Sequence, residues 1–280
     1  MTNKGKYYES QFEEATIKLL REAHWQYAFG DDIHRKYTDP LIEEDLRNFL
    51  AVQYKDKNLT TSEMDSIVAN LRNTGGQNDY YALRNTFLLY RDGYDFAYSD
   101  GRSNPFRLEY IDFEHPDHNI FRCVNQFVME QGRENRRPDI LLFINGIPVC
   151  IIELKNPTKQ NATIRDAHTQ ICTRYMRDIP ALLKYCALAV ISDGAKNALG
   201  ATYTPFEFFY EWKKIENEDK AGKGLDTLRT LIRGALSPER ILEILRDYVY
   251  FPDPTKEDDT TDLVCRLLLE KNLHICIPYC

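Results

Sequence analysis

The spacing of hydrophobic residues changes along the chain, and each change predicts a different element. Residues 8–24 repeat apolar side chains at helical spacing with charged side chains between them, which predicts an amphipathic helix. Three further helical patterns follow before Gly93, at residues 41–54, 61–73 and 78–92. Beyond Gly93 the chain has short runs rich in aromatic and β-branched residues, separated by turn residues, which is typical of antiparallel strands. We therefore expect an α/β (α+β) chain with a helical insertion at residues 39–92.

Two apolar runs in the middle of the chain, at residues 140–144 and 149–152, are joined by Asn145-Gly146. Asn-Gly between two such runs is a strong hairpin signal. Later, residues 164–178 read as a helix and residues 186–192 as a buried strand. A strand–helix–strand crossover after a hairpin favours a mixed sheet covered by helices.

Polar residues cluster at one end of the predicted hairpin. Asp139 precedes the first apolar run, and Glu153 and Lys155 follow the second. With a plain two-residue turn, Asp139 would lie on the opposite face from Glu153, because strand side chains alternate between faces. Pro148 cannot donate a ladder hydrogen bond and is typical of edges and bulges. We therefore predict an odd-length loop or a bulge near Ile147-Pro148, which moves Asp139 onto the face of Glu153 and Lys155.

Two carboxylates and a lysine at one strand end point to metal-dependent chemistry. Mg²⁺ prefers carboxylate ligands, usually one or two, with water and substrate phosphate completing its coordination. A lysine beside them can orient the attacking water or stabilise developing negative charge. The alternative is a simple salt bridge at a strand end, with Asp139 as a turn residue.

Asp139 followed by Glu153-Leu154-Lys155 resembles the PD-(D/E)-x-K nuclease motif, and Pro138 matches its first letter. Five segments in the same order resemble one family, the restriction (R) subunit of type I restriction–modification enzymes at its N-terminal nuclease region. These segments are residues 111–113 (IDF), 124–127 (VNQF), 136–157 (RRPDILLFINGIPVCIIELKNP), 177–185 (RDIPALLKY) and 191–194 (ISDG). The resemblance extends over most of residues 7–251.

This resemblance implies a restriction-endonuclease-like mixed β-sheet core flanked by helices, and Mg²⁺-dependent hydrolysis of double-stranded DNA. Asp139 and Glu153 would bind the metal, and Lys155 would position the attacking water. In nucleases of this kind the first helix often supplies a further acidic ligand, for which Glu13, or else Glu9, is the candidate. The alternative for these two glutamates is a solvated acidic face near a helix N-terminus.

Gln170 and Tyr175 resemble a Q…Y pair that R subunits carry after the nuclease motif. In the commoner pattern the two residues are four apart, which stacks them on one helical face. Here they are five apart, a rotation of about 140° on an ideal helix. Either the helix bulges between them, or only one of the two contributes to the site or to DNA binding.

DNA binding requires local positive charge, because the net charge of the chain is −7. Arg136 and Arg137 precede Asp139, Lys159 follows Lys155, and Arg174 lies on the next helix. We expect these four side chains to contact DNA phosphates; the alternative is a solvated loop. His115 and His118 lie near Asp112, but the segment is turn-like and lacks a third fixed ligand, so a metal site is not expected there.

Composition and the C-terminal region complete the sequence prediction. Seven scattered cysteines without a signal peptide or a membrane-length apolar run indicate a cytoplasmic protein with free thiols. We expect a nuclease domain at residues 1–215 and a helical C-terminal extension at residues 216–280, including a helix at 262–270. The resemblance implies that this extension leads toward an ATP-driven motor.

The comparison with R subunits also sets the expected partners. It implies a complex with methyltransferase (M) and specificity (S) subunits. The chain has no G-x-x-x-x-G-K-[ST] motif, so we expect it to be a fragment or truncated protein, with ATP used only by a full-length parent. Two alternatives to a restriction nuclease stay open: a non-catalytic docking and DNA-contact module, and a stand-alone nuclease of the same motif class.

Overall fold

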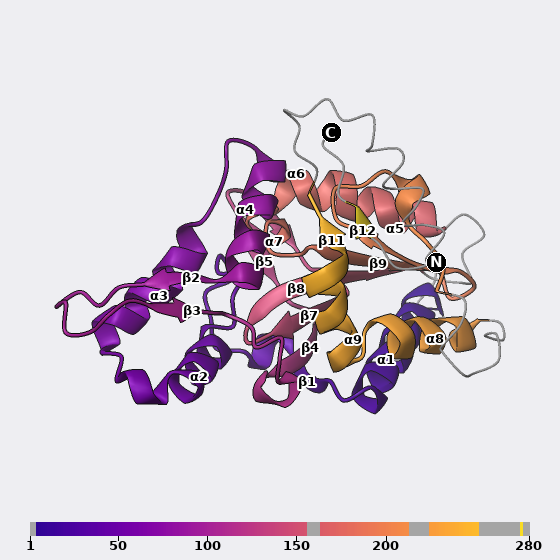
Figure 1. Ribbon diagram of the computed structural model, residues 1–280. Coiled ribbons are helices and arrows are strands. Elements are labelled where there is room, and N and C mark those ends of the chain that lie inside the picture. Colours follow the sequence, from indigo (N-terminus) through magenta and orange to yellow (C-terminus); the bar gives the residue numbers. More distant parts are fainter. Residues whose placement is uncertain (1–3, 156–162, 213–223, 252–274, 277–280) are drawn as a thin grey trace, which may run out of the picture.

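The computed structural model describes residues 4–155, 163–212, 224–251 and 275–276. Its centre is a six-stranded sheet in the order β1-β4-β7-β8-β9-β10 (Figure 1). The β1–β4 and β8–β9 pairs are parallel, and the other neighbouring pairs are antiparallel. The predicted mixed sheet is therefore confirmed. Its strands are β1 Gln26–Phe29, β4 Phe121–Asn125, β7 Ile140–Ile144, β8 Ile147–Leu154, β9 Leu188–Ser192 and β10 Asn197–Ala201.

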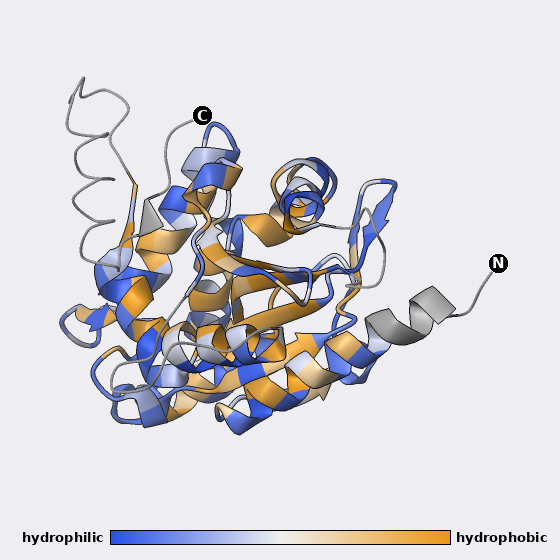
Figure 2. Cartoon of the chain, turned by 90° about the vertical axis from the view of Figure 1, so that its right-hand side faces the viewer, coloured by the Kyte–Doolittle hydropathy of each residue, from blue (hydrophilic) through white to orange (hydrophobic). Residues whose placement is uncertain are grey.

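Helices cover both faces of this sheet (Figures 1 and 2). α1 (Lys4–Glu22) lies on one side, and the crossover that links the parallel strands β8 and β9 lies on the other. Every residue of β7, β8 and β9 is buried, as expected for strands covered on both faces. The crossover consists of α5 Ile164–Thr169, a π-helical turn Gln170–Tyr175, α6 Met176–Asp178 and α7 Pro180–Leu183.

The helical insertion lies beside the sheet and contacts it through specific polar bonds. Arg122 of β4 forms an ion pair with Asp45 at 2.6 Å, and the Tyr90 hydroxyl donates to the Tyr185 carbonyl at 3.2 Å. Thr60 caps the second helix of the insertion together with Glu63 in a capping box. The three predicted helices form as α2 Glu43–Gln53, α3 Thr61–Asn73 and α4 Asp79–Asp92.

Three short strand pairs lie outside the central sheet. The runs after Gly93 were predicted to form antiparallel strands, and two of them pair in a separate two-stranded antiparallel sheet. The edge strands β1 and β10 were not predicted. The small pairs are β2 Tyr94–Phe96 with β3 Phe106–Leu108, β5 Met129–Gln131 with β6 Glu134–Arg136, and β11 Val249–Tyr250 with β12 Ile275–Cys276.

The helices after residue 224 pack on the same core. α8 (Leu225–Ala235) contacts β10 and α1, and the Trp25 indole donates to the Leu236 carbonyl at 2.7 Å. α9 (Pro238–Glu243) follows and continues into a π-helical turn. The division into two domains at residue 215 stays a prediction, and the helix predicted at residues 262–270 lies outside the described residues.

The β7–β8 hairpin has the geometry that the sequence required. Asn145 and Gly146 form its turn with φ values of 51° and 76°, so both central residues are left-handed. Phe143 pairs with Pro148 while Leu142 pairs with Cys150, which leaves Val149 as an extra residue on β8. The predicted bulge near Ile147-Pro148 is confirmed.

The turn fits tightly against the start of α2, which predicts a large effect of a small substitution. A Cβ at Gly146 would lie 2.1 Å from the Ile42 carbonyl oxygen, whereas a Cβ at Gly101, also at positive φ, would meet nothing within 4 Å. We expect Gly101→Ala to lower the free energy of unfolding by about 1 kcal/mol from backbone strain, and Gly146→Ala to lower it by about 3 kcal/mol because packing strain adds. Urea unfolding measures both; equal losses would contradict the contact.

Candidate active site

Asp139 and Glu153 face each other across the β7–β8 hairpin. Because Val149 is bulged out, Ile140 pairs with Ile152, and continuing this register by one residue beyond β7 sets Asp139 opposite Glu153. Residues directly opposite in an antiparallel pair project to the same face. The Asp139 carboxylate accepts a hydrogen bond from the Leu154 backbone N–H at 2.7 Å, which fixes its orientation. The predicted convergence of the two carboxylates is present in the structure.

The surroundings of Asp139 disfavour its negatively charged form. Burial raises the pKa of the Asp139 carboxyl well above its ordinary value of 3.8, and the charge on Glu153 raises it further. The Leu154 N–H and the Lys155 ammonium lower the pKa of Asp139, but by less. Two partly desolvated carboxylates with this imbalance are a donor set that suits a hard divalent cation.

Hydrogen bonds from both its backbone N–H and its ammonium group hold Lys155 beside Glu153. Its backbone N–H donates to the Ser192 carbonyl of β9 at 2.7 Å. Its ammonium donates to Glu153 Oε1 at 2.8 Å and to Gln170 Oε1 at 2.6 Å. The Lys155 side chain is 15% exposed, whereas that of Glu153 is 2% exposed.

Gln170 and Tyr175 meet because the helix between them is a π-helical turn, Gln170–Tyr175. An i→i+5 turn places residues five apart on one face, which an α-helix does not. The Gln170 amide donates to the Tyr175 hydroxyl at 2.6 Å, and that hydroxyl donates to Glu153 Oε2 at 3.2 Å. Of the two sequence alternatives, the helical bulge is the one that the structure contains.

Tyr175 stays protonated in this environment and therefore remains a hydrogen-bond donor. Burial raises the pKa of the phenol, and the negative charge on Glu153 raises it further. The Tyr175 hydroxyl thus connects the helix to Glu153, while Lys155 connects Glu153 to Gln170. The two carboxylate oxygens of Glu153 are consequently held in different directions, one by a cation and one by a neutral donor.

Glu13 of α1 approaches the same site from the opposite side of the sheet. Its charge is among the groups that raise the pKa of Asp139. The Asn125 amide donates to Glu13 Oε1 at 2.6 Å, and the Gln126 amide donates to its two oxygens at 3.0 and 3.1 Å. The Tyr27 hydroxyl in turn donates to Asn125 Oδ1 at 3.0 Å. The side chain of Glu9, the other candidate, lies outside the described residues.

Asn125 and Gln126 are the residues that sequence reasoning did not assign to the site. Asn125 ends β4, which is next to β7 in the sheet, and Gln126 follows it, so both side chains reach Glu13 of α1. Gln126 has a left-handed backbone with φ of 55°, uncommon for a residue other than glycine, which turns its amide toward Glu13. Both residues belong to the VNQF segment at residues 124–127. Its resemblance to the R-subunit family was the sequence signal that could have assigned them to the site.

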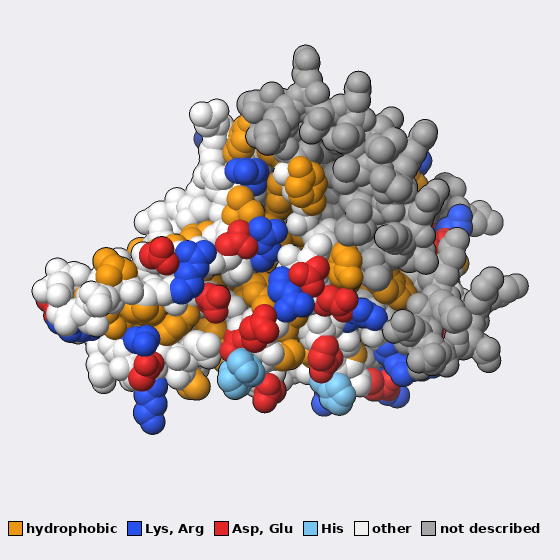
Figure 3. All heavy atoms as spheres, viewed as in Figure 1, with side chains coloured by type: hydrophobic (Ala, Val, Ile, Leu, Met, Phe, Trp, Pro, Cys, Tyr) orange, Lys and Arg blue, Asp and Glu red, His pale blue; other side chains and the backbone are white. Residues whose placement is uncertain are grey.

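The basic residues predicted for DNA contact fall into two groups. The Arg136 guanidinium pairs with Glu134 and lies 2.6 Å from Asp178, so it joins β6 to α6 inside the protein. Arg137 and Arg174 are exposed near the site, and Lys159 lies outside the described residues. Over the described part of the face shown in Figure 3, acidic and basic side chains lie side by side. DNA contact by these residues stays a prediction.

A search of the described helices finds none long and apolar enough to cross a membrane.

Comparisons with known proteins agree on one family. A family model described as the N terminus of the type I restriction enzyme R protein matches residues 6–208. The HindI endonuclease subunit, a type I restriction enzyme subunit of Haemophilus influenzae, is 31% identical over 256 residues, covering 87% of this chain and 24% of that subunit. The putative MjaIXP endonuclease subunit of Methanocaldococcus jannaschii is 28% identical over 261 residues, covering 85% of this chain and 25% of that subunit.

The present chain therefore spans about a quarter of the length of these two relatives. The matched residues 6–208 make up more than half of the chain and include Glu13, Asp139, Glu153, Lys155 and the π-helical turn. The chain belongs to the type I restriction enzyme R protein N-terminal family.

Proposed function

We propose that this chain is the nuclease module of a type I restriction enzyme and that it hydrolyses phosphodiester bonds of double-stranded DNA with Mg²⁺. The observation that carries the proposal is the cluster of Asp139, Glu153 and Lys155 at one end of the β7–β8 hairpin. The family and the names of its relatives, which are endonuclease subunits, support the same activity.

Asp139 and Glu153 are the residues that would hold the metal, with Glu13 as an outer ligand. The raised pKa of Asp139 supports this assignment, because a bound cation would offset both the burial and the neighbouring charge that raise it. Mg²⁺, when bound, supplies positive charge to the scissile phosphate and lowers the pKa of a water.

The remaining side chains would orient the reactants. The Lys155 ammonium, held by Glu153 and Gln170, would direct hydrogen bonds to the attacking water or to the phosphate as it gains negative charge. Tyr175 would keep the Glu153 carboxylate in place, and Gln170 would limit the motion of Lys155. Hydrolysis adds the water oxygen to phosphorus and releases the sugar oxygen as the leaving group.

The wider assembly belongs to the same proposal. Arg137, Arg174 and Lys159 would contact DNA phosphates, whereas Arg136 would act mainly by bracing the loop before Asp139, because Glu134 and Asp178 already neutralise it. M and S subunits would supply DNA recognition, and ATP would be used by the longer protein, in the cytoplasm.

Nicking of a supercoiled plasmid in the presence of Mg²⁺ tests the nuclease assignment. We expect wild-type protein to nick, and Asp139→Ala and Lys155→Ala each to lower the rate by at least about 100-fold, because each removes a group that acts on the transition state. The control is Lys55→Ala, an exposed lysine of the helical insertion.

Three outcomes separate the possibilities. Nicking that survives both substitutions would sink the assignment of the site. Absence of nicking, with calorimetric Mg²⁺ binding that Asp139→Ala abolishes, would indicate a competent site that acts only in the longer assembly. Absence of both would favour a non-catalytic docking module.

The raised pKa of Asp139 predicts how the stability of metal-free protein changes with pH. A carboxyl whose pKa is raised on folding contributes stability below its ordinary value of 3.8, and this contribution is lost as pH rises through the folded-state value. Asp139→Asn removes the ionisation but can still accept from the Leu154 N–H. In EDTA we expect the Tm of this variant to exceed that of wild type increasingly as pH rises from about 4 to neutrality.

Thermal unfolding of both proteins across this range measures the difference. The exposed Asp95, whose side chain is 76% accessible, provides the control Asp95→Asn, which should show no widening difference. A constant difference between wild type and Asp139→Asn at all pH values would contradict a raised pKa. Mg²⁺ should restore the stability of wild type more than that of the variant.

The amide contacts to Glu13 predict that Asn125 and Gln126 support metal binding without touching the metal. Gln126→Ala removes the donor to both Glu13 oxygens. We expect it to weaken Mg²⁺ binding roughly tenfold, as for other residues that orient a ligand. Calorimetric titration measures this, with the exposed Gln77→Ala as control. Wild-type affinity in both Gln126→Ala and Glu13→Gln would remove Glu13 from the ligand set.

A further inference from the structure

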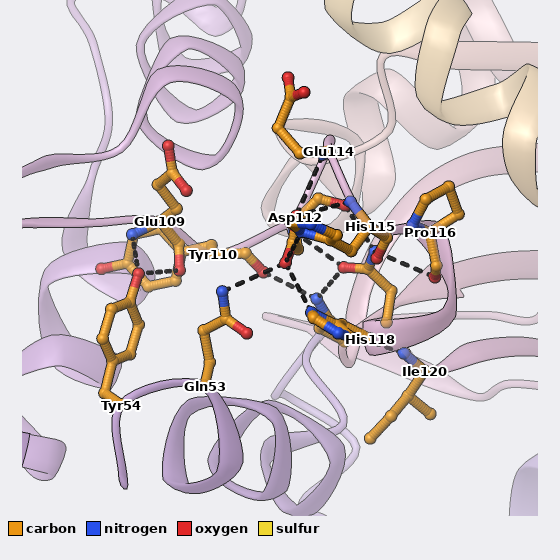
Figure 4. Close-up of polar contacts among 12 residues, drawn as sticks. Gln53, Tyr54, Glu109, Tyr110, Asp112, Glu114, His115, Pro116, His118 and Ile120 are labelled. Carbon is orange, nitrogen blue, oxygen red and sulfur yellow. Dashed lines mark hydrogen bonds and ion pairs between the residues drawn. The ribbon is translucent and has the colours of Figure 1, made fainter. Parts of the chain in front are cut away.

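A second group of metal-ligating side chains lies in the loop between β3 and β4. Asp112, His115 and His118 each offer one ligand atom, and these atoms all lie within 4.8 Å of one another (Figure 4). Asp112 Oδ2 is 2.9 Å from His118 Nδ1 and 3.3 Å from His115 Nδ1. The two imidazole rings stack with centroids 4.8 Å apart. Both histidines therefore direct the same ring nitrogen toward one carboxylate oxygen.

We propose that Asp112, His115 and His118 bind a divalent transition-metal ion of the Zn²⁺ class, with water completing the coordination. Imidazole nitrogen and carboxylate oxygen are both ordinary ligands of Zn²⁺, and three protein ligands with one water form a common four-coordinate arrangement. From the sequence a metal site was not expected here, because the segment is turn-like and lacked a third fixed ligand. The structure provides that ligand in Asp112.

Backbone donors hold the Asp112 carboxylate in position. Its Oδ1 accepts from the backbone N–H groups of Glu114 and His115 at 3.0 and 2.9 Å. Gln53 of the helical insertion donates to Oδ2 at 3.2 Å. These bonds leave Oδ2 directed at the two imidazoles, as Figure 4 shows. A carboxylate oriented by such outer contacts is typical of protein metal sites.

The loop itself is closed by two asparagines. Asn119 Oδ1 accepts from the Asp112 N–H at 2.9 Å, and its amide donates to the Asp112 carbonyl at 2.7 Å. The Asn145 amide, at the turn of the β7–β8 hairpin, donates to Asn119 Oδ1 at 2.8 Å. All three ligands therefore come from a short loop whose ends are tied to each other and to the central hairpin. Binding of an ion therefore requires little further ordering of this loop.

Access and protonation also suit a cation. The Asp112 side chain is 7% exposed, while those of His115 and His118 are 64% and 50% exposed, so the carboxylate lies at the base of the cluster and the imidazoles at its rim. Metal-free, each Nδ1 can donate a hydrogen to Oδ2; metal-bound, the hydrogen of each neutral imidazole resides on Nε2. Binding of the ion therefore requires both imidazoles to be neutral.

The position of the cluster indicates a structural role, distinct from the candidate active site. It adjoins the turn of the β7–β8 hairpin, whereas Asp139 lies at the other end of β7. Five strand residues at about 3.3 Å each separate the two ends by about 16 Å. Glu114 also pairs with Arg246 near the C-terminal helices at 3.4 Å. An ion here would stabilise a loop that contacts the helical insertion through Gln53, the hairpin through Asn145 and the C-terminal region through Arg246.

Calorimetric titration of the metal-stripped full chain with Zn²⁺ tests the proposal. Excess Mg²⁺ in the buffer occupies sites built from oxygen ligands, such as Asp139 with Glu153. We expect saturable Zn²⁺ binding in wild type, and an affinity at least about tenfold weaker in His115→Ala and in His118→Ala. His34→Ala, an exposed histidine outside the cluster, serves as the matched control. Zn²⁺ should raise the Tm of wild type and His34→Ala but not of His118→Ala.

A Co²⁺ spectrum distinguishes this cluster from cysteine ligands elsewhere in the chain. Binding at Asp112, His115 and His118 gives d–d absorption without a thiolate charge-transfer band, and His118→Gln should abolish it while circular dichroism verifies the fold. The proposal is overturned by the absence of saturable Zn²⁺ binding, by binding that both alanine variants leave unchanged, or by a spectrum that shows thiolate coordination alone.

Discussion

The bulge at Val149 is the constraint on which the candidate site depends. A two-residue turn at Asn145-Gly146 without the bulge would pair Asp139 with Ile152 and turn its carboxylate to the opposite face of the sheet from Glu153. One extra residue on β8 shifts the register between Phe143 and Leu142, and this shift brings Asp139 opposite Glu153. Burial of the whole of β7 and β8 keeps this register, because a further slip would move every side chain to the other covered face of the sheet and disrupt its packing.

The helix that covers the site also contains a local insertion, in the form of a π-helical turn. The π-helical turn at Gln170–Tyr175 accommodates five-residue spacing and still brings both side chains to Glu153 and Lys155. The strand bulge at Val149 sets the register that reaches Glu153, and the π-helical turn brings Gln170 and Tyr175 to Lys155 and Glu153. Each is a local irregularity that is stabilised by the contacts it permits, and together they hold two carboxylates close enough to raise the pKa of Asp139.

Polar side chains cluster at both ends of the β7–β8 hairpin. At the open end lie Asp139, Glu153 and Lys155, and at the turn Asn145 is bonded to the loop of Asp112, His115 and His118. The helical insertion contacts the turn end through Ile42 and Gln53. The β7–β8 hairpin thus connects the candidate nuclease site at one end to the contacts with the helical insertion at the other.

The sequence by itself determined the hairpin, the need for a bulge, the convergence of Asp139 with Glu153 and Lys155, the helical insertion, and the family. The hairpin, the bulge, the convergence and the insertion follow from local periodicity, turn chemistry and spacing along the chain, which are properties of neighbouring residues, whereas the family followed from the resemblance of five sequence segments. Only the tertiary structure decided that β1 and β10 form the sheet edges, that Asn125 and Gln126 hold Glu13, that Arg136 is engaged by Asp178, and that Asp112 joins two histidines. Most of these depend on contacts between residues far apart in the chain, or on side-chain directions fixed by them. No local pattern encodes such contacts.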